Sequence, residues 1–165
     1  MKTLILNHQQ IHQKLNRLAY QVYEANYKED EIIVAGIEPN GALLAQRLAD
    51  KLKEITGKKI GLATLKVHKS NPLQSELVCE KGGCDFAGKS VVLVDDVLNT
   101  GRTMIYGIKY FLEYPIKQLH TVVLVDRDHK KFPVRADYIG VSLSTNLQEH
   151  VAVELSQTTD SVYLE

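Results

Sequence analysis

The most constraining feature of the sequence is a run of four apolar residues that leads directly into two acids. Residues 91–94 read Val-Val-Leu-Val without a polar interruption, which is typical of a strand buried on both faces of a parallel sheet. Asp95 and Asp96 follow at once, and a short loop then leads to a helix predicted to start near Arg102 and to stop by Pro115. This order predicts an α/β fold, in which ligands lie at the carboxyl ends of the strands.

The rest of the chain shows the same alternation of helix and strand patterns. Asn7 followed by Gln10 resembles a helix capping box. The chain has 165 residues, of which 44% are hydrophobic, and it contains no internal repeat, so we expect one domain over residues 1–165. Apolar spacing predicts helices over 11–22 and 43–55, and strands over 32–35, 60–67, 121–125, 138–139 and 151–155.

Charge and hydropathy exclude several classes of function. Lys plus Arg and Asp plus Glu each number 20, so the whole chain has no global attraction to nucleic acid or to anionic membranes. No apolar run reaches the roughly 18 residues of a membrane-spanning helix, and the apolar start at residues 4–6 is too short for a signal peptide. We therefore expect a cytoplasmic protein. Cys79 and Cys84 are the only cysteines, too few for a zinc site of four ligands, so we expect two ordinary thiols in a loop.

One long connection lacks clear periodicity. Residues 68–88 contain Pro72, Gly82, Gly83 and Gly88. A loop of about 20 residues is unusual in a compact domain and often serves as a lid over an active site. We therefore expect this segment to be a loop that closes over a ligand.

The residues after the apolar run suggest a sugar phosphate site. Two adjacent carboxylates are costly at a strand end without a partner, and the 2′ and 3′ hydroxyls of a ribose can donate hydrogen bonds to them. Gly101 lets the backbone approach a ligand closely, successive amides before a helix bind anions, and Thr100 and Thr103 add hydroxyl donors. The plainer interpretation is a strand end with a capping Asp and a Thr-Gly turn.

The string from Val91 to Thr103 as a whole resembles the signature with which type I phosphoribosyltransferases bind 5-phosphoribosyl 1-diphosphate (PRPP). The resemblance implies a mostly parallel central sheet flanked by helices, with a small hood, and PRPP binding with Mg²⁺. It implies that Asp95 and Asp96 are catalytic and hold the ribose hydroxyls. It assigns the 5-phosphate to the following loop, which comprises Val97, Leu98, Asn99, Thr100, Gly101, Arg102 and Thr103.

A second string, from Leu124 to Gly140, narrows the resemblance. It is similar to the family of bifunctional pyrimidine operon regulators and uracil phosphoribosyltransferases, the PyrR family, and the similarity runs along most of the chain. The family implies a dimer and places the base near Tyr138 and Ile139, and we expect Asp126 and Arg127 to border it. Tyr138 can stack on a flat ring, although a half-buried strand aromatic is the plainer interpretation of this residue.

The segment from Gly36 to Gly41 departs from this family. PyrR-like proteins typically have Gly-Ile-Lys-Thr-Arg-Gly where this chain has Gly-Ile-Glu-Pro-Asn-Gly. Arg binds diphosphate oxygens bidentately, whereas a Glu repels them. The pyrophosphate loop is therefore expected to use the backbone of residues 38–41, which are Glu38, Pro39, Asn40 and Gly41, and catalytic turnover is in question.

Basic residues elsewhere leave the partners open. Lys66, His68 and Lys69 could supply the missing positive charge, although a solvated basic loop edge is the plainer interpretation. Arg17 and His129 match positions that the family uses for RNA, but the family's Thr-Arg-x-x-His pattern is replaced by Asn-Arg-Leu-Ala-Tyr at residues 16–20. Three hypotheses follow: an enzyme acting on uracil first, a regulator that senses PRPP or nucleotide with little activity, and a paralogue acting on a purine.

Overall fold

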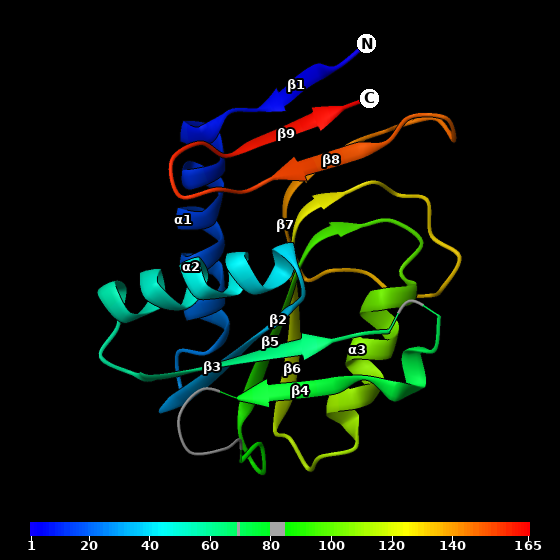
Figure 1. Cartoon of the computed structure of the whole chain (residues 1–165). Coiled ribbons are helices and arrows are strands. Elements are labelled where there is room, and N and C mark those ends of the chain that lie inside the picture. Colours follow the sequence, from blue (N-terminus) through cyan, green and yellow to red (C-terminus); the bar gives the residue numbers. More distant parts are fainter. Residues whose placement is uncertain (69, 80–84) are drawn as a thin grey trace.

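A six-stranded, mostly parallel sheet forms the centre of the molecule. The computed structural model describes residues 1–68, 70–79 and 85–165 (Figure 1). The strand order is β4-β3-β2-β5-β6-β7, and β4 pairs antiparallel with β3 whereas the other neighbours are parallel. The strands are β2 (Glu31–Ile37), β3 (Lys59–Lys66), β4 (Glu76–Cys79), β5 (Ser90–Leu98), β6 (Gln118–Asp126) and β7 (Tyr138–Ser142). The predicted α/β class is confirmed.

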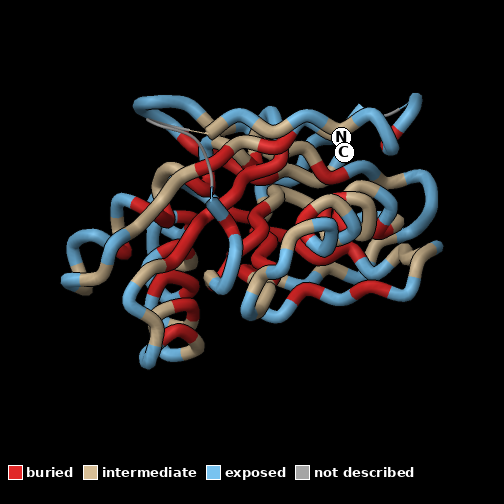
Figure 2. The backbone as a smooth tube through the Cα atoms, turned by 90° about the horizontal axis from the view of Figure 1, so that it is seen from below, coloured by how far each residue is buried: buried red, intermediate tan, exposed pale blue. Residues whose placement is uncertain are grey.

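Three helices cover the two faces of this sheet. Helices α1 (His8–Ala25) and α2 (Asn40–Ile55) pack on one face, and α3 (Arg102–Leu112) packs on the other. Along β5, Val92 and Val94 belong to the core on the α1 and α2 side, and Val91 and Leu93 belong to the core on the α3 side. This division explains the unbroken apolar run, because each successive side chain needs an apolar environment. Buried residues, red in Figure 2, accordingly run through the middle of the molecule.

A small second sheet forms a hood over the carboxyl end of the central sheet. Strands β1 (Thr3–Leu6), β9 (Ser161–Leu164) and β8 (Val151–Glu154) lie in the order β1-β9-β8 and are antiparallel. Figure 1 shows this hood at the top, with both chain termini side by side. The capping box before α1 is also present, since the side chains of Asn7 and Gln10 each accept a hydrogen bond of 2.9 Å from the other's backbone N–H.

The segment over residues 68–88 differs from the expected loop. Residues Pro72–Gln74 form the short 3-10 helix η1, and β4 pairs with β3 from Lys66 opposite Glu76 to Ala63 opposite Cys79. The expectation of a structureless loop is therefore wrong for these residues. Exposed and partly buried residues alternate along β4 for only four residues. This is too short a stretch for the two-residue period of a strand to be recognised in the sequence. Residues 69 and 80–84, and with them Cys84, lie outside the described residues.

None of the helices described over residues 1–68, 70–79 and 85–165 is both long enough and apolar enough to span a membrane.

Candidate functional site

The two acids lie near the end of β5, half-buried below the hood. The strand continues through both of them to Leu98, further than the apolar run predicts. Asp95 Oδ1 accepts a 2.8 Å hydrogen bond from the N–H of Asp96, and Asp96 Oδ1 accepts one of 2.8 Å from the N–H of Val97. Backbone amides therefore hold one oxygen of each carboxylate in place.

The loop after β5 encloses a small cavity at the start of α3. The cavity measures about 60 Å³ and is lined by Asp95, Val97, Leu98, Asn99, Thr100, Gly101, Arg102, Thr103 and Met104. The structure thus brings together seven consecutive residues that the sequence assigns to the 5-phosphate. Backbone amides and hydroxyls at a helix N-terminus suit an anion.

Gly101 is required for the shape of this loop. It precedes α3 with φ +85°, and a Cβ added to it would lie 2.4 Å from Cγ1 of Val134. The carbonyl of Thr100 accepts hydrogen bonds from the N–H groups of Lys131 and Phe132, at 2.8 and 3.2 Å. The loop after β6 thereby holds the loop after β5 against it, which fixes the anion cavity.

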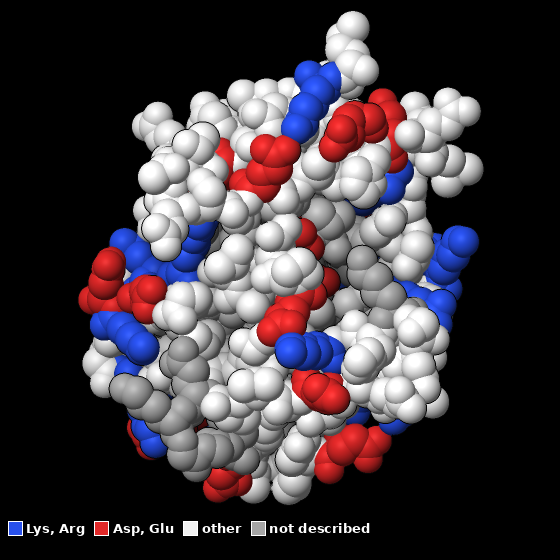
Figure 3. All heavy atoms as spheres, viewed as in Figure 1, with Lys and Arg blue, Asp and Glu red and all other residues white. Residues whose placement is uncertain are grey.

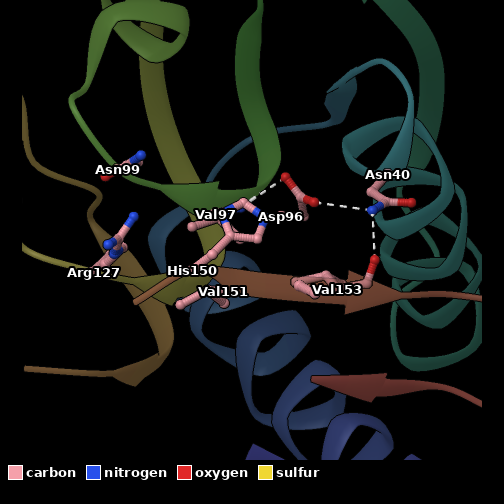
Figure 4. Close-up of a pocket in the computed structure, with 9 residues that line it drawn as sticks. Asn40, Asp96, Val97, Asn99, Arg127, His150, Val151 and Val153 are labelled. Atoms are coloured by element: carbon pink, nitrogen blue, oxygen red, sulfur yellow. Dashed lines mark hydrogen bonds between the residues drawn. The ribbon is translucent and has the colours of Figure 1, made fainter. Parts of the chain in front are cut away.

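A larger cavity of about 390 Å³ adjoins the acids (Figure 4). It lies between the end of β5, the start of α2 and strand β8, and it is lined by Asn40, Asp96, Val97, Asn99, Arg127, His150, Val151, Ala152 and Val153. Asn40 Nδ2 donates to Asp96 Oδ2 and to the carbonyl of Val153, each at 3.0 Å. Figure 4 shows the side chains of Asn40 and Asp96 pointing toward each other. The sequence did not single out His150, which precedes β8 without a motif around it.

Arg127 borders this cavity, but its guanidinium group donates hydrogen bonds to other residues of the protein. Its side chain is buried, and Nε donates to Thr145 Oγ1 at 2.8 Å. Its Nη2 donates to the carbonyl of Asn146 at 3.0 Å and also to that of Glu149. Arg127 therefore holds the segment that leads into His150 and β8, and it positions one wall of the cavity.

The residues expected around the base are divided between different places. Asp126 and Ile139 line a third cavity of about 350 Å³, whereas Arg127 lines the one in Figure 4. Tyr138 packs on the α1 side, with its ring centroid 6.0 Å from that of His120, and burial raises the pKa of its hydroxyl. Among the described residues, Tyr138 lines none of these cavities. Neighbouring side chains point to opposite faces of a strand, so Tyr138 and Ile139 cannot line the same wall.

The backbone near Ile139 is also engaged. Arg17 Nη2 donates to the carbonyl of Ile139 at 2.7 Å and to that of Gly140 at 2.9 Å. These hydrogen bonds tie α1 to β7. Arg17 therefore has a structural role, and the carbonyl groups of Ile139 and Gly140 already have a donor.

The expected pyrophosphate loop, residues 38–41, joins β2 to α2 and packs tightly on β5. A Cβ on Gly41 would lie 2.7 Å from the carbonyl oxygen of Val94. Pro39 has no N–H, and the N–H of Glu38 donates to the carbonyl of Leu65 at 3.0 Å. Within the expected pyrophosphate loop, the N–H groups of Asn40 and Gly41 at the start of α2 are therefore the backbone donors to consider for diphosphate.

The charge at this loop is balanced within the protein. Lys66 Nζ lies 4.0 Å from Glu38 Oε2, so Lys66 reaches the loop, as the sequence suggested, but pairs with the Glu. His68 lies in the exposed segment after β3, and Lys69 is outside the described residues. On the face shown in Figure 3, Lys and Arg residues lie among Asp and Glu residues. That face presents no extended basic surface of the kind that RNA backbones require.

Comparison with known proteins agrees with this arrangement. Residues 2–158 match the model of the phosphoribosyl transferase domain. Two bifunctional PyrR proteins, from Bacillus cereus and Bacillus thuringiensis subsp. konkukian, are each 36% identical to this chain over 168 residues, covering 95% of the chain and 92% of the relative.

Solved structures share the fold at much lower identity. A hypoxanthine phosphoribosyltransferase of Trypanosoma cruzi superimposes with a TM-score of 0.79 at 15% identity, covering 98% of this chain and 95% of that one. A hypoxanthine-guanine phosphoribosyltransferase of Bacillus anthracis gives 0.70 at 19% identity, covering 86% and 82%. The acids at the end of β5, the glycine loop before α3 and the match along nearly the whole length lead to one conclusion: this chain belongs to the phosphoribosyltransferase family and has the type I fold.

Proposed function

We propose that this protein transfers the ribose 5-phosphate of PRPP to a pyrimidine base, with uracil as the first candidate, and releases pyrophosphate. The observation that carries this proposal is the position of Asp95 and Asp96 between the small anion cavity and the larger cavity of Figure 4. A ribose whose hydroxyls meet these acids has its 5-phosphate on one side and its C1 on the other. The sequence relatives named PyrR favour a pyrimidine.

The larger cavity is the site that we propose for the base. It borders Asp96 and Val97 directly, and the imidazole of His150 gives it a flat ring. Aromatic rings, including imidazole, stack on bases. This assignment moves the base away from Tyr138, which packs on the α1 side, and makes Arg127 the residue that supports the base-binding wall.

The chemistry follows from charge. A pyrimidine nitrogen displaces pyrophosphate from C1, and positive charge develops on the ribose ring as the bond to the leaving oxygen lengthens. The carboxylates of Asp95 and Asp96 favour that charge electrostatically. Mg²⁺, when bound with PRPP, would neutralise the leaving diphosphate. Substrate oxygens and water would hold it, and the carboxylates of Asp95 and Asp96 are oxygen ligands of the kind that it prefers. No side-chain nucleophile is required.

A regulator that senses PRPP or nucleotide with little turnover is the second candidate. It is favoured by the pyrophosphate loop, where Glu38 is paired with Lys66 and Asn40 is hydrogen-bonded to Asp96. An RNA partner is not favoured, because Arg17 is engaged with β7. Action on a purine rests only on the fold shared with purine enzymes. We also propose a cytoplasmic dimer, as the family resemblance implies.

The test is a panel of bases with Mg-PRPP. Uracil, hypoxanthine, guanine, adenine and orotate are compared by pyrophosphate release, and PRPP and nucleotide monophosphates are titrated by calorimetry. Replacing Asp95 and Asp96 by Asn removes charged hydrogen bonds worth about 1.5–3 kcal/mol each, so affinity falls at least about tenfold. Unchanged binding in the double variant refutes the ribose assignment. Nucleotide binding without turnover on any base supports the regulator.

A further inference from the structure

A cluster of three potential metal ligands lies outside the site described above. His8 and His12 are four residues apart in the first turns of α1, so their rings share one face of the helix. Their ring centroids are 4.4 Å apart. Asp160 comes from the turn between β8 and β9, and its side chain points at both rings. These residues join the first helix to the last hairpin of the hood.

The spacing of Asp160 Oδ2 from the two ring nitrogens suits a tetrahedral ion. Asp160 Oδ2 lies 3.2 Å from His8 Nδ1 and 3.3 Å from His12 Nε2, and all three atoms lie within 4.8 Å of one another. Metal–ligand bonds of about 2.0–2.2 Å in a tetrahedron place neighbouring ligand atoms roughly 3.3–3.6 Å apart. The two distances to Asp160 therefore need almost no adjustment to bind an ion.

The carboxylate is held in place before any ion arrives. Asp160 is 1% exposed, its Oδ1 accepts a hydrogen bond from the N–H of Ser156 at 3.0 Å, and its Oδ2 accepts one from Arg47 Nη1 at 2.7 Å. Burial alone would raise the pKa of Asp160, but the hydrogen bonds from Arg47 and Ser156 outweigh it and lower the pKa. Hydrogen bonds to a ligating carboxylate orient it.

Both imidazoles are accessible to an ion. The side chains of His8 and His12 are 46% and 50% exposed. They border a cavity of about 550 Å³, whose other walls include Gln46, Arg47 and Gln157. An ion held by the three side chains would keep an open position toward this cavity, where water can complete the coordination.

We propose that His8 Nδ1, His12 Nε2 and Asp160 Oδ2 bind a divalent transition metal ion, with Zn²⁺ as the first candidate. Two imidazoles with one carboxylate favour Zn²⁺, Ni²⁺ or Cu²⁺ over Mg²⁺, which prefers oxygen ligands. The site is separate from any Mg²⁺ that accompanies PRPP.

Two neighbouring groups limit its affinity. The charge of Arg47 repels the ion, and the N–H of Asp160 donates to His8 Nδ1 at 3.1 Å, so the ion must replace that hydrogen bond. Binding is therefore weaker than at a zinc site of four thiolates.

The experiment uses the full chain without an affinity tag, after treatment with a chelator. Calorimetry with ZnCl₂ is expected to give one site per chain, and Co²⁺ is expected to give the visible absorption of a tetrahedral ion. An ion at 100 times its Kd adds about 2.7 kcal/mol, which for a chain of this length raises Tm by roughly 5–10 °C. MgCl₂ at the same concentration is expected to leave Tm unchanged.

The variants separate this site from adventitious binding. His12→Gln removes one half-exposed ligand and leaves the Arg47–Asp160 pair intact, so we expect Zn²⁺ affinity to fall at least about tenfold and the Tm shift to fall to about half or less. His68→Gln removes an exposed imidazole outside the cluster and serves as the matched control. Absence of Zn²⁺ binding, equal binding by wild type and His12→Gln, or an equal loss in His68→Gln overturns the proposal. The Asp95 and Asp96 double variant retains the Zn²⁺ site whatever its effect on PRPP.

Discussion

Replacing Gly101 by Ala tests whether the anion loop has the shape described here. Two costs arise together. An Ala at φ +85° has an unfavourable backbone conformation, and its Cβ would lie 2.4 Å from Cγ1 of Val134. Gly88 supplies a matched control, because it has φ +70° but no atom within 4 Å of the position of an added Cβ. Gly88→Ala therefore carries the backbone cost without the steric one.

The magnitudes follow from these two terms. A left-handed conformation costs an L-residue about 1–2 kcal/mol, and inserting a methyl group into a filled space costs about 1–3 kcal/mol. We expect Gly88→Ala to lower the free energy of unfolding by about 1–2 kcal/mol and Gly101→Ala by about 2–5 kcal/mol. For a chain of this length the difference between the two variants is roughly 2–12 °C in Tm.

The assay is thermal and urea unfolding of both variants, together with calorimetric titration of ribose 5-phosphate. Gly101→Ala should weaken the binding of ribose 5-phosphate, whereas Gly88→Ala should leave the affinity for this ligand unchanged. Combining Gly101→Ala with Val134→Ala removes the steric term, so the two changes together should cost about 1–3 kcal/mol less than the sum of the single changes. Equal destabilisation by the two glycine variants, or strict additivity with Val134→Ala, refutes the reasoning.

Three further predictions concern the site and the hood. In calorimetry, His150→Ala should weaken the binding of a pyrimidine nucleotide by about 1–3 kcal/mol and should change the binding of ribose 5-phosphate little. Tyr138→Ala should instead reduce the stability of the fold more than the affinity for nucleotide, and the reverse pattern would restore Tyr138 as the stacking residue. The double variant Glu38→Lys with Asn40→Arg adds two cations beside the diphosphate and releases Lys66 from its ion pair with Glu38. The initial rate with saturating Mg-PRPP and uracil should therefore rise about tenfold, and a slower variant would contradict this prediction. Because its pKa is lowered in the folded protein, the carboxylate of Asp160 contributes stability that is fully present above its ordinary pKa of 3.8 and is lost as pH falls through the lowered pKa. In urea unfolding, the loss of stability caused by Asp160→Asn should therefore shrink below about pH 4, and a loss independent of pH would contradict this prediction.

The local elements and the chemistry of the anion loop could be predicted from the sequence alone. The unbroken apolar run at 91–94 can be buried only on both faces, which required a central parallel strand, and the helix then started at Arg102 as expected. The capping box at Asn7 is a contact between residues three apart. Eight residues of the anion cavity, 97–104, are consecutive in the chain. In each case the interacting groups are close in sequence, so local patterns carry the information.

Contacts between side chains that are distant in sequence could not be predicted and are visible only in the folded chain. His8 lies 152 residues from Asp160 in sequence, and Asn40 lies 113 residues from Val153, whose carbonyl it binds. The sequence string from Leu124 to Gly140 suggested one base site, but strand alternation turns Tyr138 toward α1 and Ile139 toward the opposite face. Such contacts depend on how the sheet, the helices and the hood pack together, because packing brings into contact residues that no local spacing relates.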